Sequence, residues 1–269
     1  MAAALGQSAV IFVPQKAPQA KVAQLLIYGA HVLLVEGTYN DAFELCQESV
    51  AAFGFYDRSC AVNPFLIEGK KTGGLEIAEQ TRTDPADVVV VSVGDGCTVA
   101  GIVKGMRELV TLGLAPTLPR VLGVQARGAP AIAEAFARGS EQWVPQGGDT
   151  VADSIAVSHP RNAVKALRAV RQSSGTFVTV SDDEILAAVS TLARTTGVFA
   201  EPTAAATVAG VLEARRTGWL GPDADVLILI TGNGLKDVTG ALRAAPAPLL
   251  VAPRLEAVRT ALAGRLPGL

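Results

Sequence analysis

The stretch that decides the fold is Val88-Val-Val-Val-Ser-Val-Gly94-Asp-Gly-Cys-Thr-Val-Ala-Gly101. A run of β-branched apolar residues ends at two closely spaced glycines, and a new apolar stretch follows them at once. Such a run is typical of a parallel strand that is buried on both faces. The sequence therefore predicts a strand, a tight glycine turn and a helix start, which is the repeating unit of an α/β protein.

The segments on either side continue this alternation of strand and helix. Before the stretch, we predict strands at residues 9–13 and 31–35 and helices at residues 18–28, 39–53 and 68–81. From the stretch onward, we predict strands at residues 87–93, 120–125, 177–180 and 225–230, and helices at residues 99–113, 130–138, 160–173, 203–216 and 255–263, with a further helix capped by Ser181 and Glu184.

These elements predict a doubly wound α/β protein with mostly parallel sheets in two lobes. The turn-rich residues 54–64 interrupt the alternation, which then restarts. We therefore expect residues 1–58 to belong to a small lobe and residues 59–269 to form a large cofactor-binding lobe.

The composition excludes several classes of function. Hydrophobic residues make up 49% and charged residues 18%, with a formal net charge of −2 and no basic cluster, so we expect no nucleic-acid partner. The apolar runs are too short to cross a membrane. Three separated cysteines (Cys46, Cys60 and Cys97) and two histidines (His31 and His159) indicate no metal site and no disulfide framework. These features suit the reducing cytoplasm.

The glycine loop is a candidate anion site. Gly94 and Gly96 permit positive φ and a close approach of the backbone to a ligand. The free N–H groups of the loop and of the first helical turn suit a phosphate, and Thr98 adds a hydroxyl. The spacing matches neither G-x-G-x-x-G nor the Walker loop. A turn that only lets the strand meet the helix is the alternative.

Thr231 follows the last predicted strand and should lie at the same sheet edge as the glycine loop. A neutral hydroxyl there suits an unprotonated ring nitrogen, whereas a carboxylate would favour the protonated ring. The alternative is that Thr231 only caps the next turn.

Several segments together resemble threonine synthase and its relatives among the fold type II pyridoxal-phosphate-dependent enzymes, the tryptophan synthase β-like superfamily. They occur in the order and with the spacing of that family and cover nearly the whole chain. The matching segments are residues 62–72, 93–98 with Lys104-Gly105, 122–125, 180–185, 197–202 and 231–237.

The resemblance implies that the cofactor is pyridoxal 5′-phosphate. The residues that match the family's phosphate loop are Gly94, Asp95, Gly96, Cys97 and Thr98. Thr231 matches the hydroxyl residue that faces the pyridine nitrogen. Glu201 matches an acidic position near the active site, and entry into a helix before Pro202 is an equal alternative.

The chain also departs from the family pattern. We find neither the Ser-Phe-Lys-Asp-like segment with the Schiff-base lysine nor the Ser-Thr-Gly-Asn-like loop, so we expect that the N-terminal part is missing and assign no catalytic residue. None of the seven lysines matches the catalytic position. Leu66 stands where threonine synthases that take O-phosphohomoserine carry an arginine, and an apolar side chain cannot replace a guanidinium.

The resemblance implies a threonine synthase-like lyase of threonine biosynthesis. It would convert O-phosphohomoserine to threonine or catalyse a related elimination or replacement on a small amino acid. We expect a cytoplasmic protein that forms a homodimer or associates through exposed apolar surface. One alternative is a non-catalytic partner that needs a second chain for the lysine. Another is an unrelated nucleotide binder, which the missing acidic residue near Arg127 disfavours.

Overall fold

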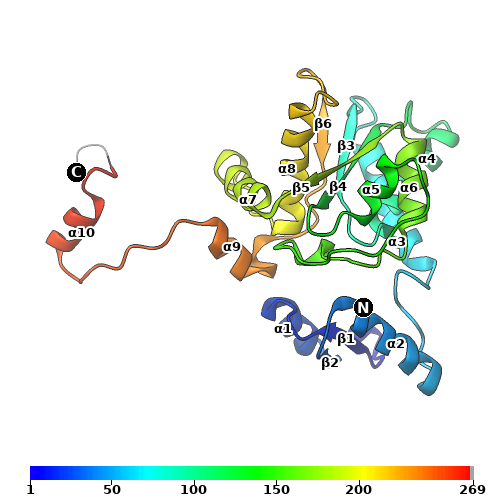
Figure 1. The fold of residues 1–269 in the computed structure, drawn as a ribbon, viewed down its shortest axis with the longest axis horizontal. Helices are drawn as coiled ribbons and strands as arrows, with labels where there is room; N and C mark the ends of the chain where they lie inside the picture. The colour runs from blue at the N-terminus through cyan, green and yellow to red at the C-terminus, as the bar shows by residue number, and fades with distance from the viewer. Residues whose placement is uncertain (267–269) are drawn as a thin grey trace.

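The computed structural model describes residues 1–266, which form a small lobe, a larger lobe and a C-terminal arm (Figure 1). The small lobe is a two-stranded parallel sheet in which a helix follows each strand. Its elements are η1 (Ala3–Leu5), β1 (Val10–Pro14), α1 (Gln19–Ile27), β2 (His31–Val35) and α2 (Tyr39–Phe53).

Helix α2 begins and ends as its sequence predicts. The Thr38 hydroxyl accepts a hydrogen bond from the Asp41 N–H at 3.3 Å, and the Asp41 carboxylate accepts one from the Thr38 N–H at 2.6 Å. This reciprocal capping box satisfies two N–H groups that the helix cannot pair itself. Gly54 ends the helix with a left-handed φ of 69°.

The larger lobe contains a four-stranded parallel sheet with the order β5-β4-β3-β6. Its strands are β3 (Val88–Ser92), β4 (Arg120–Ala126), β5 (Thr176–Val180) and β6 (Val226–Ile228). Its helices are α3 (Phe65–Gln80), α4 (Cys97–Thr111), α5 (Ala131–Ala137), α6 (Ala163–Gln172), α7 (Asp182–Thr196), α8 (Pro202–Arg216) and α9 (Val238–Ala244), with short 3-10 turns at η2 (Asp153–Ile155) and η3 (Gly234–Lys236).

Strand β3 is the centre of two hydrophobic cores. Val88 and Val90 pack on one face among side chains of α7 and α8. Val89 and Val91 pack on the other face among side chains of α3, α4, α5 and α6. All four valines are fully buried, because alternate side chains of a strand point to opposite faces. The fold is therefore the doubly wound α/β class that the valine run predicts.

Helices α3 and α4 approach each other closely through glycine. A Cβ atom on Gly74 would collide with the backbone carbonyl of Ile102, and one on Gly105 would collide with that of Lys71. Gly69 on the same helix α3 has open space at this position. Glycine at these contacts therefore permits a backbone-to-backbone approach that no other residue allows.

Several boundaries differ from the prediction. Helix α3 begins at Phe65 rather than residue 68, because the Asn63 side chain accepts the Phe65 N–H at 3.1 Å. Helix α4 begins at Cys97 rather than residue 99, because Gly96 already supplies the turn into the helix. Strand β6 ends at Ile228 rather than residue 230.

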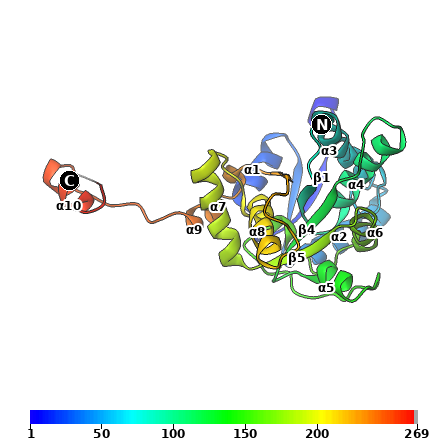
Figure 2. The same cartoon turned by 90° about the horizontal axis from the view of Figure 1, so that it is seen from above.

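The C-terminal part holds one helix that the prediction lacks. Asp237 accepts the N–H of Gly240 at 2.9 Å and so begins α9. Residues 245–254 then lead to α10 (Leu255–Leu262), which stands away from both lobes (Figures 1 and 2).

No helix within residues 1–266 is long and apolar enough to span a bilayer. The domain boundary after residue 58 stays a prediction, and the irregular residues 54–64 lie between α2 and α3.

The close packing of α3 on α4 gives a stability prediction. We expect Gly74→Ala to lower the free energy of unfolding by about 1–3 kcal/mol, because the added methyl meets backbone rather than a movable side chain. Gly69→Ala in the same helix should be neutral or stabilising by up to about 1 kcal/mol. Urea denaturation of both variants measures the difference, and equal effects would contradict this account of the packing.

Candidate active site at the carboxyl edge of the large sheet

The glycine loop and Thr231 meet at one edge of the large sheet. In the parallel pair of β3 and β6, Val90 lies opposite Ile228. Three residues beyond that pair stand Val93, which directly precedes Gly94, and Thr231, which is exposed. Ligands of doubly wound sheets bind at this edge, outside the carboxyl ends of the strands.

The loop presents a row of unused backbone donors. Within residues 1–266, no protein group accepts a hydrogen bond from the backbone N–H groups of residues 94–99, and the first N–H paired here is that of Ala100 with the Gly96 carbonyl at 3.2 Å. These groups precede or open α4, where the helix dipole adds positive potential. The arrangement suits an anion.

Glycine is required at both ends of the turn. Gly96 has a left-handed φ of 95°, and a Cβ atom there would lie 2.8 Å from the Asn162 carbonyl oxygen. A Cβ atom on Gly94 would lie 2.9 Å from the carbonyl oxygen of Ser154. The loop is therefore held between the chain around η2 on one side and the start of α6 on the other.

Asp95 directs its carboxylate toward the start of α6. One oxygen accepts the Arg161 N–H at 2.7 Å, and the other accepts the Asn162 side-chain amide at 2.7 Å. The Asn162 N–H also donates to the Asp95 carbonyl at 3.0 Å. The sequence predicts Asp95 in a phosphate loop, which stays a prediction; these contacts tie the glycine loop to the start of α6.

Gln125 supports the loop from β4 and is fully buried. Its side-chain amide donates to the Val93 carbonyl at 3.2 Å. Its oxygen accepts the N–H groups of Ile132 and Ala133 at 2.9 and 2.8 Å and so satisfies the start of α5. The sequence analysis assigns no role to Gln125. A polar residue within an otherwise apolar strand is the pattern that could have identified it, because buried polar groups need hydrogen-bond partners.

Two cysteines and a lysine lie beside the loop. The Lys70 ammonium donates to the Cys60 sulfur at 3.1 Å. Interaction with the Cys97 thiol, followed by the hydrogen bond from Lys70, holds the pKa of Cys60 below its ordinary value. Interaction with Cys60, together with burial, raises the pKa of Cys97.

Tyr39 shares these surroundings as a neutral phenol. Burial raises its pKa to about 12, and the negative charge of Asp95 adds to the increase.

Within residues 1–266, we find no group of three or more His, Cys, Asp or Glu side chains that could hold a metal ion.

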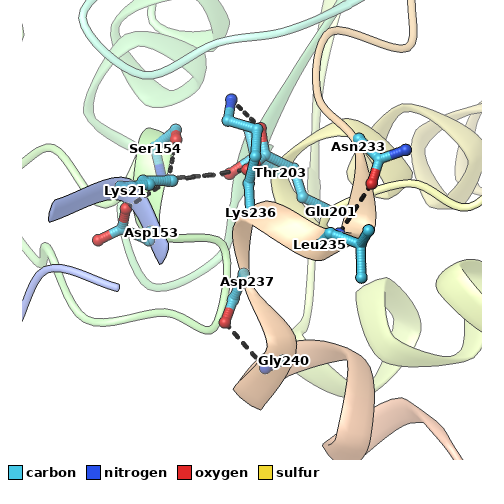
Figure 3. A network of polar contacts seen from close by, with 10 residues as sticks. All are labelled: Lys21, Asp153, Ser154, Glu201, Thr203, Asn233, Leu235, Lys236, Asp237 and Gly240. Atoms are coloured by element: carbon cyan, nitrogen blue, oxygen red, sulfur yellow. Dashed lines mark hydrogen bonds and ion pairs between the residues drawn. The ribbon is translucent and has the colours of Figure 1, made fainter. Parts of the chain in front are cut away.

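A buried carboxylate links the two lobes (Figure 3). Glu201 is 3% exposed and directly precedes Pro202 at the start of α8. It pairs with Lys236 at 3.3 Å and with Lys21 of the small-lobe helix α1 at 3.7 Å. Glu201 directly precedes α8, as the helix-entry interpretation predicts, whereas its place near an active site stays a prediction.

Lys21 also joins the small lobe to η2. Its ammonium donates to the Asp153 carboxylate at 2.7 Å and to the Ser154 hydroxyl at 2.9 Å (Figure 3). The Ser154 N–H in turn donates to the Thr203 hydroxyl at 3.1 Å. Sequence reasoning missed these partners, because they are more than 130 residues apart from Lys21 and no local pattern marks them.

Comparison with known proteins identifies the family. The family described as pyridoxal-phosphate dependent enzyme matches residues 1–232. The chain belongs to this family. It is 37% identical over 262 residues to the threonine synthase of Methanosarcina acetivorans, and the match covers 97% of this chain and 64% of that protein. It is 38% identical to the threonine synthase of Mycobacterium tuberculosis strain H37Rv, and that match covers 91% of this chain and 66% of that protein.

Solved structures of the family share the fold. A fungal L-serine ammonia-lyase from Rhizomucor miehei matches with a TM-score of 0.73 at 23% identity, over 90% of this chain and 75% of that one. A pyridoxal 5′-phosphate-dependent aspartate racemase matches with a TM-score of 0.71 at 25% identity, over 87% of this chain and 68% of that one. The fold is that of the fold type II pyridoxal-phosphate enzymes, whose cofactor is pyridoxal 5′-phosphate.

The ion pair between Lys21 and the buried Glu201 carboxylate gives a testable prediction about stability. In a double-mutant cycle of Lys21→Met and Glu201→Gln, we expect a coupling of about 0.5–3 kcal/mol in the free energy of unfolding, because the carboxylate is shielded from water. The exposed pair of Arg259 and Glu256 in α10 serves as the control and should show no coupling beyond error. Additive effects of the first two substitutions would show that Lys21 and Glu201 do not interact.

Proposed function

We propose that the loop Gly94–Thr98 binds the phosphate group of pyridoxal 5′-phosphate in a threonine synthase-like lyase. The observation that carries this proposal is the row of N–H groups of residues 94–99 at the start of α4, for which the described part of the chain provides no acceptor. A phosphate dianion satisfies several such donors at once and interacts favourably with the helix dipole. The glycine cradle fits the group, because side chains at positions 94 and 96 would fill the close contacts of the loop.

The remaining residues of the edge supply position and electrostatics. Thr98 lies in the first turn of α4 and offers a hydroxyl to the same anion. Thr231 offers a neutral hydroxyl toward a ring nitrogen, which leaves that nitrogen unprotonated. The cofactor, when bound, acts as an electron sink for the bonds at the amino acid's α-carbon. The pair of Glu201 and Lys236 lies next to Thr231, since the Glu201 N–H donates to the Gly232 carbonyl at 3.0 Å.

We infer that none of the seven lysines serves as the Schiff-base residue. That role needs an amine that can lose its proton and reach the cofactor. Hydrogen bonds to Glu108 and then to Glu68 raise the pKa of both Lys71 and Lys104, which keeps them protonated. Lys165 donates to the Asn162 side chain at 3.2 Å. Lys70 is bound to the Cys60 sulfur, and Lys21 and Lys236 are paired with Glu201.

The substrate proposed is a small amino acid with a leaving group at its β- or γ-carbon. Leu66 lies in the first turn of α3, where the resemblance places an arginine for a substrate phosphate. An aliphatic side chain cannot form the bidentate contacts of a guanidinium, so a substrate without that phosphate fits this position better. Two reactions are therefore candidates: the threonine synthase reaction itself, and a related elimination or replacement on another amino acid.

Association through apolar surface is also part of the proposal. Large apolar side chains of the small lobe are exposed, among them Ile27 at 83%, Tyr28 at 67% and Phe53 at 69%. Exposed apolar groups in such numbers mark interaction surfaces. A non-catalytic role, in which a second chain supplies the lysine, remains the alternative function, and the pairing of the chain's own lysines favours it.

Cofactor binding tests the phosphate loop. We expect Thr98→Ala to weaken the binding of pyridoxal 5′-phosphate by about tenfold, which corresponds to about 1.4 kcal/mol for one lost hydrogen bond to a charged group. Thr111→Ala at the other end of α4 makes the same chemical change and should leave the affinity unchanged. Equilibrium dialysis measures both, and inorganic phosphate should compete. Equal binding of pyridoxal without its phosphate would refute the assignment of the loop.

Borohydride reduction tests the lysines. We expect reduction of the chain with pyridoxal 5′-phosphate to give weak labelling spread over exposed amines such as Lys16. Peptide mapping by mass spectrometry identifies the labelled positions. A stoichiometric label on one lysine, together with turnover of an amino acid, would overturn the inference. Labelling of a second chain in a complex would support the partner role.

A further inference from the structure

Each end of the glycine loop packs against a segment that contacts the small lobe. At the first end, a Cβ atom on Gly94 would lie 2.9 Å from the carbonyl oxygen of Ser154, which belongs to η2. At the second end, a Cβ atom on Gly96 would lie 2.8 Å from the carbonyl oxygen of Asn162, which directly precedes α6. The positions of η2 and of the start of α6 therefore set the space in which the loop lies.

Lys21 of α1 holds η2 from the small lobe (Figure 3). Its ammonium donates to the Asp153 carboxylate at 2.7 Å and to the Ser154 hydroxyl at 2.9 Å. The Lys21 side chain is 22% exposed, so water screens these bonds only in part. The small lobe thus fixes the segment against which Gly94 packs.

Arg161 holds the start of α6 from the small lobe. Its backbone N–H donates to the Asp95 carboxylate at 2.7 Å, in the middle of the glycine loop. Its guanidinium donates to the side-chain oxygen of Asn40 at 2.6 Å and lies 3.6 Å from the centre of the Phe43 ring. Both partners belong to α2. A cation over an aromatic ring adds to the hydrogen bond, so one residue joins the loop to the small lobe.

We propose that Lys21 and Arg161 are positioning residues through which the small lobe keeps the glycine loop in its anion-binding conformation. Among residues 1–266, every hydrogen bond and ion pair between residues 1–53 and residues 65–266 involves one of these two side chains. The role rests on the proposed function, because the ligand of the loop is an anion. By linkage, an anion on the loop then opposes separation of the lobes, and loss of either contact favours opening of the loop.

Cys97 reports the conformation of the loop without a cofactor. It directly follows Gly96 and is 8% exposed, so an alkylating reagent reaches it when the loop opens. The full chain is treated with iodoacetamide, and alkylation of each cysteine is followed by mass spectrometry of its peptide. We expect Arg161→Met and Lys21→Met each to raise the rate at Cys97 about tenfold, because each loses a hydrogen bond that involves a charged group.

Two matched controls remove the same charges elsewhere. Arg168→Met changes an arginine of α6 whose side chain is 62% exposed and pairs with Glu141. Lys16→Met changes an exposed lysine between β1 and α1. Both should leave the alkylation rate of Cys97 unchanged. Equal acceleration by the controls, or an unchanged rate in Arg161→Met and Lys21→Met, would overturn the proposal.

Asn40→Leu tests the contact of Arg161 from the small-lobe side. It removes the acceptor of the guanidinium and places a good helix former in the first turn of α2, so the fold is retained. Alkylation of Cys97 should again be faster, and the double variant with Arg161→Met should be no faster than Arg161→Met alone. Fully additive acceleration would show that Arg161 does not act through Asn40.

Inorganic phosphate distinguishes positioning from a purely structural role. In the native chain, phosphate at about ten times its dissociation constant should slow alkylation of Cys97 about tenfold. It should also slow hydrogen exchange of the amides of α1 and α2, and this second effect should be absent when Lys21→Met and Arg161→Met are combined. Protection of Cys97 without any effect on α1 and α2 would refute the link to the small lobe. If phosphate protects neither, the phosphate assignment fails, whereas faster alkylation in the two variants would still support both positioning residues.

Discussion

The burial of β3 on both faces is the constraint on which the rest of the structure depends. Four consecutive valines fill two cores at once, so this strand cannot turn either face to water. The strand ends at Ser92, two residues before Gly94. The chain must therefore change from buried strand to helix within a few residues, and glycine makes that change possible. The unused N–H groups of residues 94–99 are a direct result of this short transition.

The neighbours of this transition are held by contacts from distant parts of the chain. Asn162 at the start of α6 contacts both Asp95 and Cys60, and Gln125 in β4 holds Val93. Each of these polar side chains is buried or nearly so, and each has its hydrogen bonds satisfied within the cluster. Networks of this kind keep a loop in one conformation, because any other conformation would leave buried groups without partners. The anion site is therefore preorganised by side chains that need not touch the anion.

The sequence predicts the order of elements and the position of the glycine loop, because both depend on local patterns. The valine run, the capping box at Ser181 and the glycines each act over a few residues. The boundaries of α3 and α4 were less well predicted, since side chains and turns just before each helix decide its first residue. The contacts of Lys21 with Asp153 and of Asn162 with Cys60 could not be predicted from local patterns, because only the folded chain brings these residues together.

The charges around the loop explain why its donors come from the backbone. Asp95 places negative charge close to the proposed phosphate site, and a second anion there is disfavoured by repulsion. The carboxylate of Asp95 is neutralised in part by the donors at the start of α6, and the Lys70 ammonium is engaged with the Cys60 sulfur. Among residues 1–266, the N–H groups that open α4 thus remain as donors without a protein acceptor. A lysine at this edge would add attraction, but the nearby ammonium groups of Lys21 and Lys236 are held by Glu201. Binding of a phosphate then depends on the geometry of the turn more than on net charge, which makes the conformation of Gly96 the property that matters most for the site.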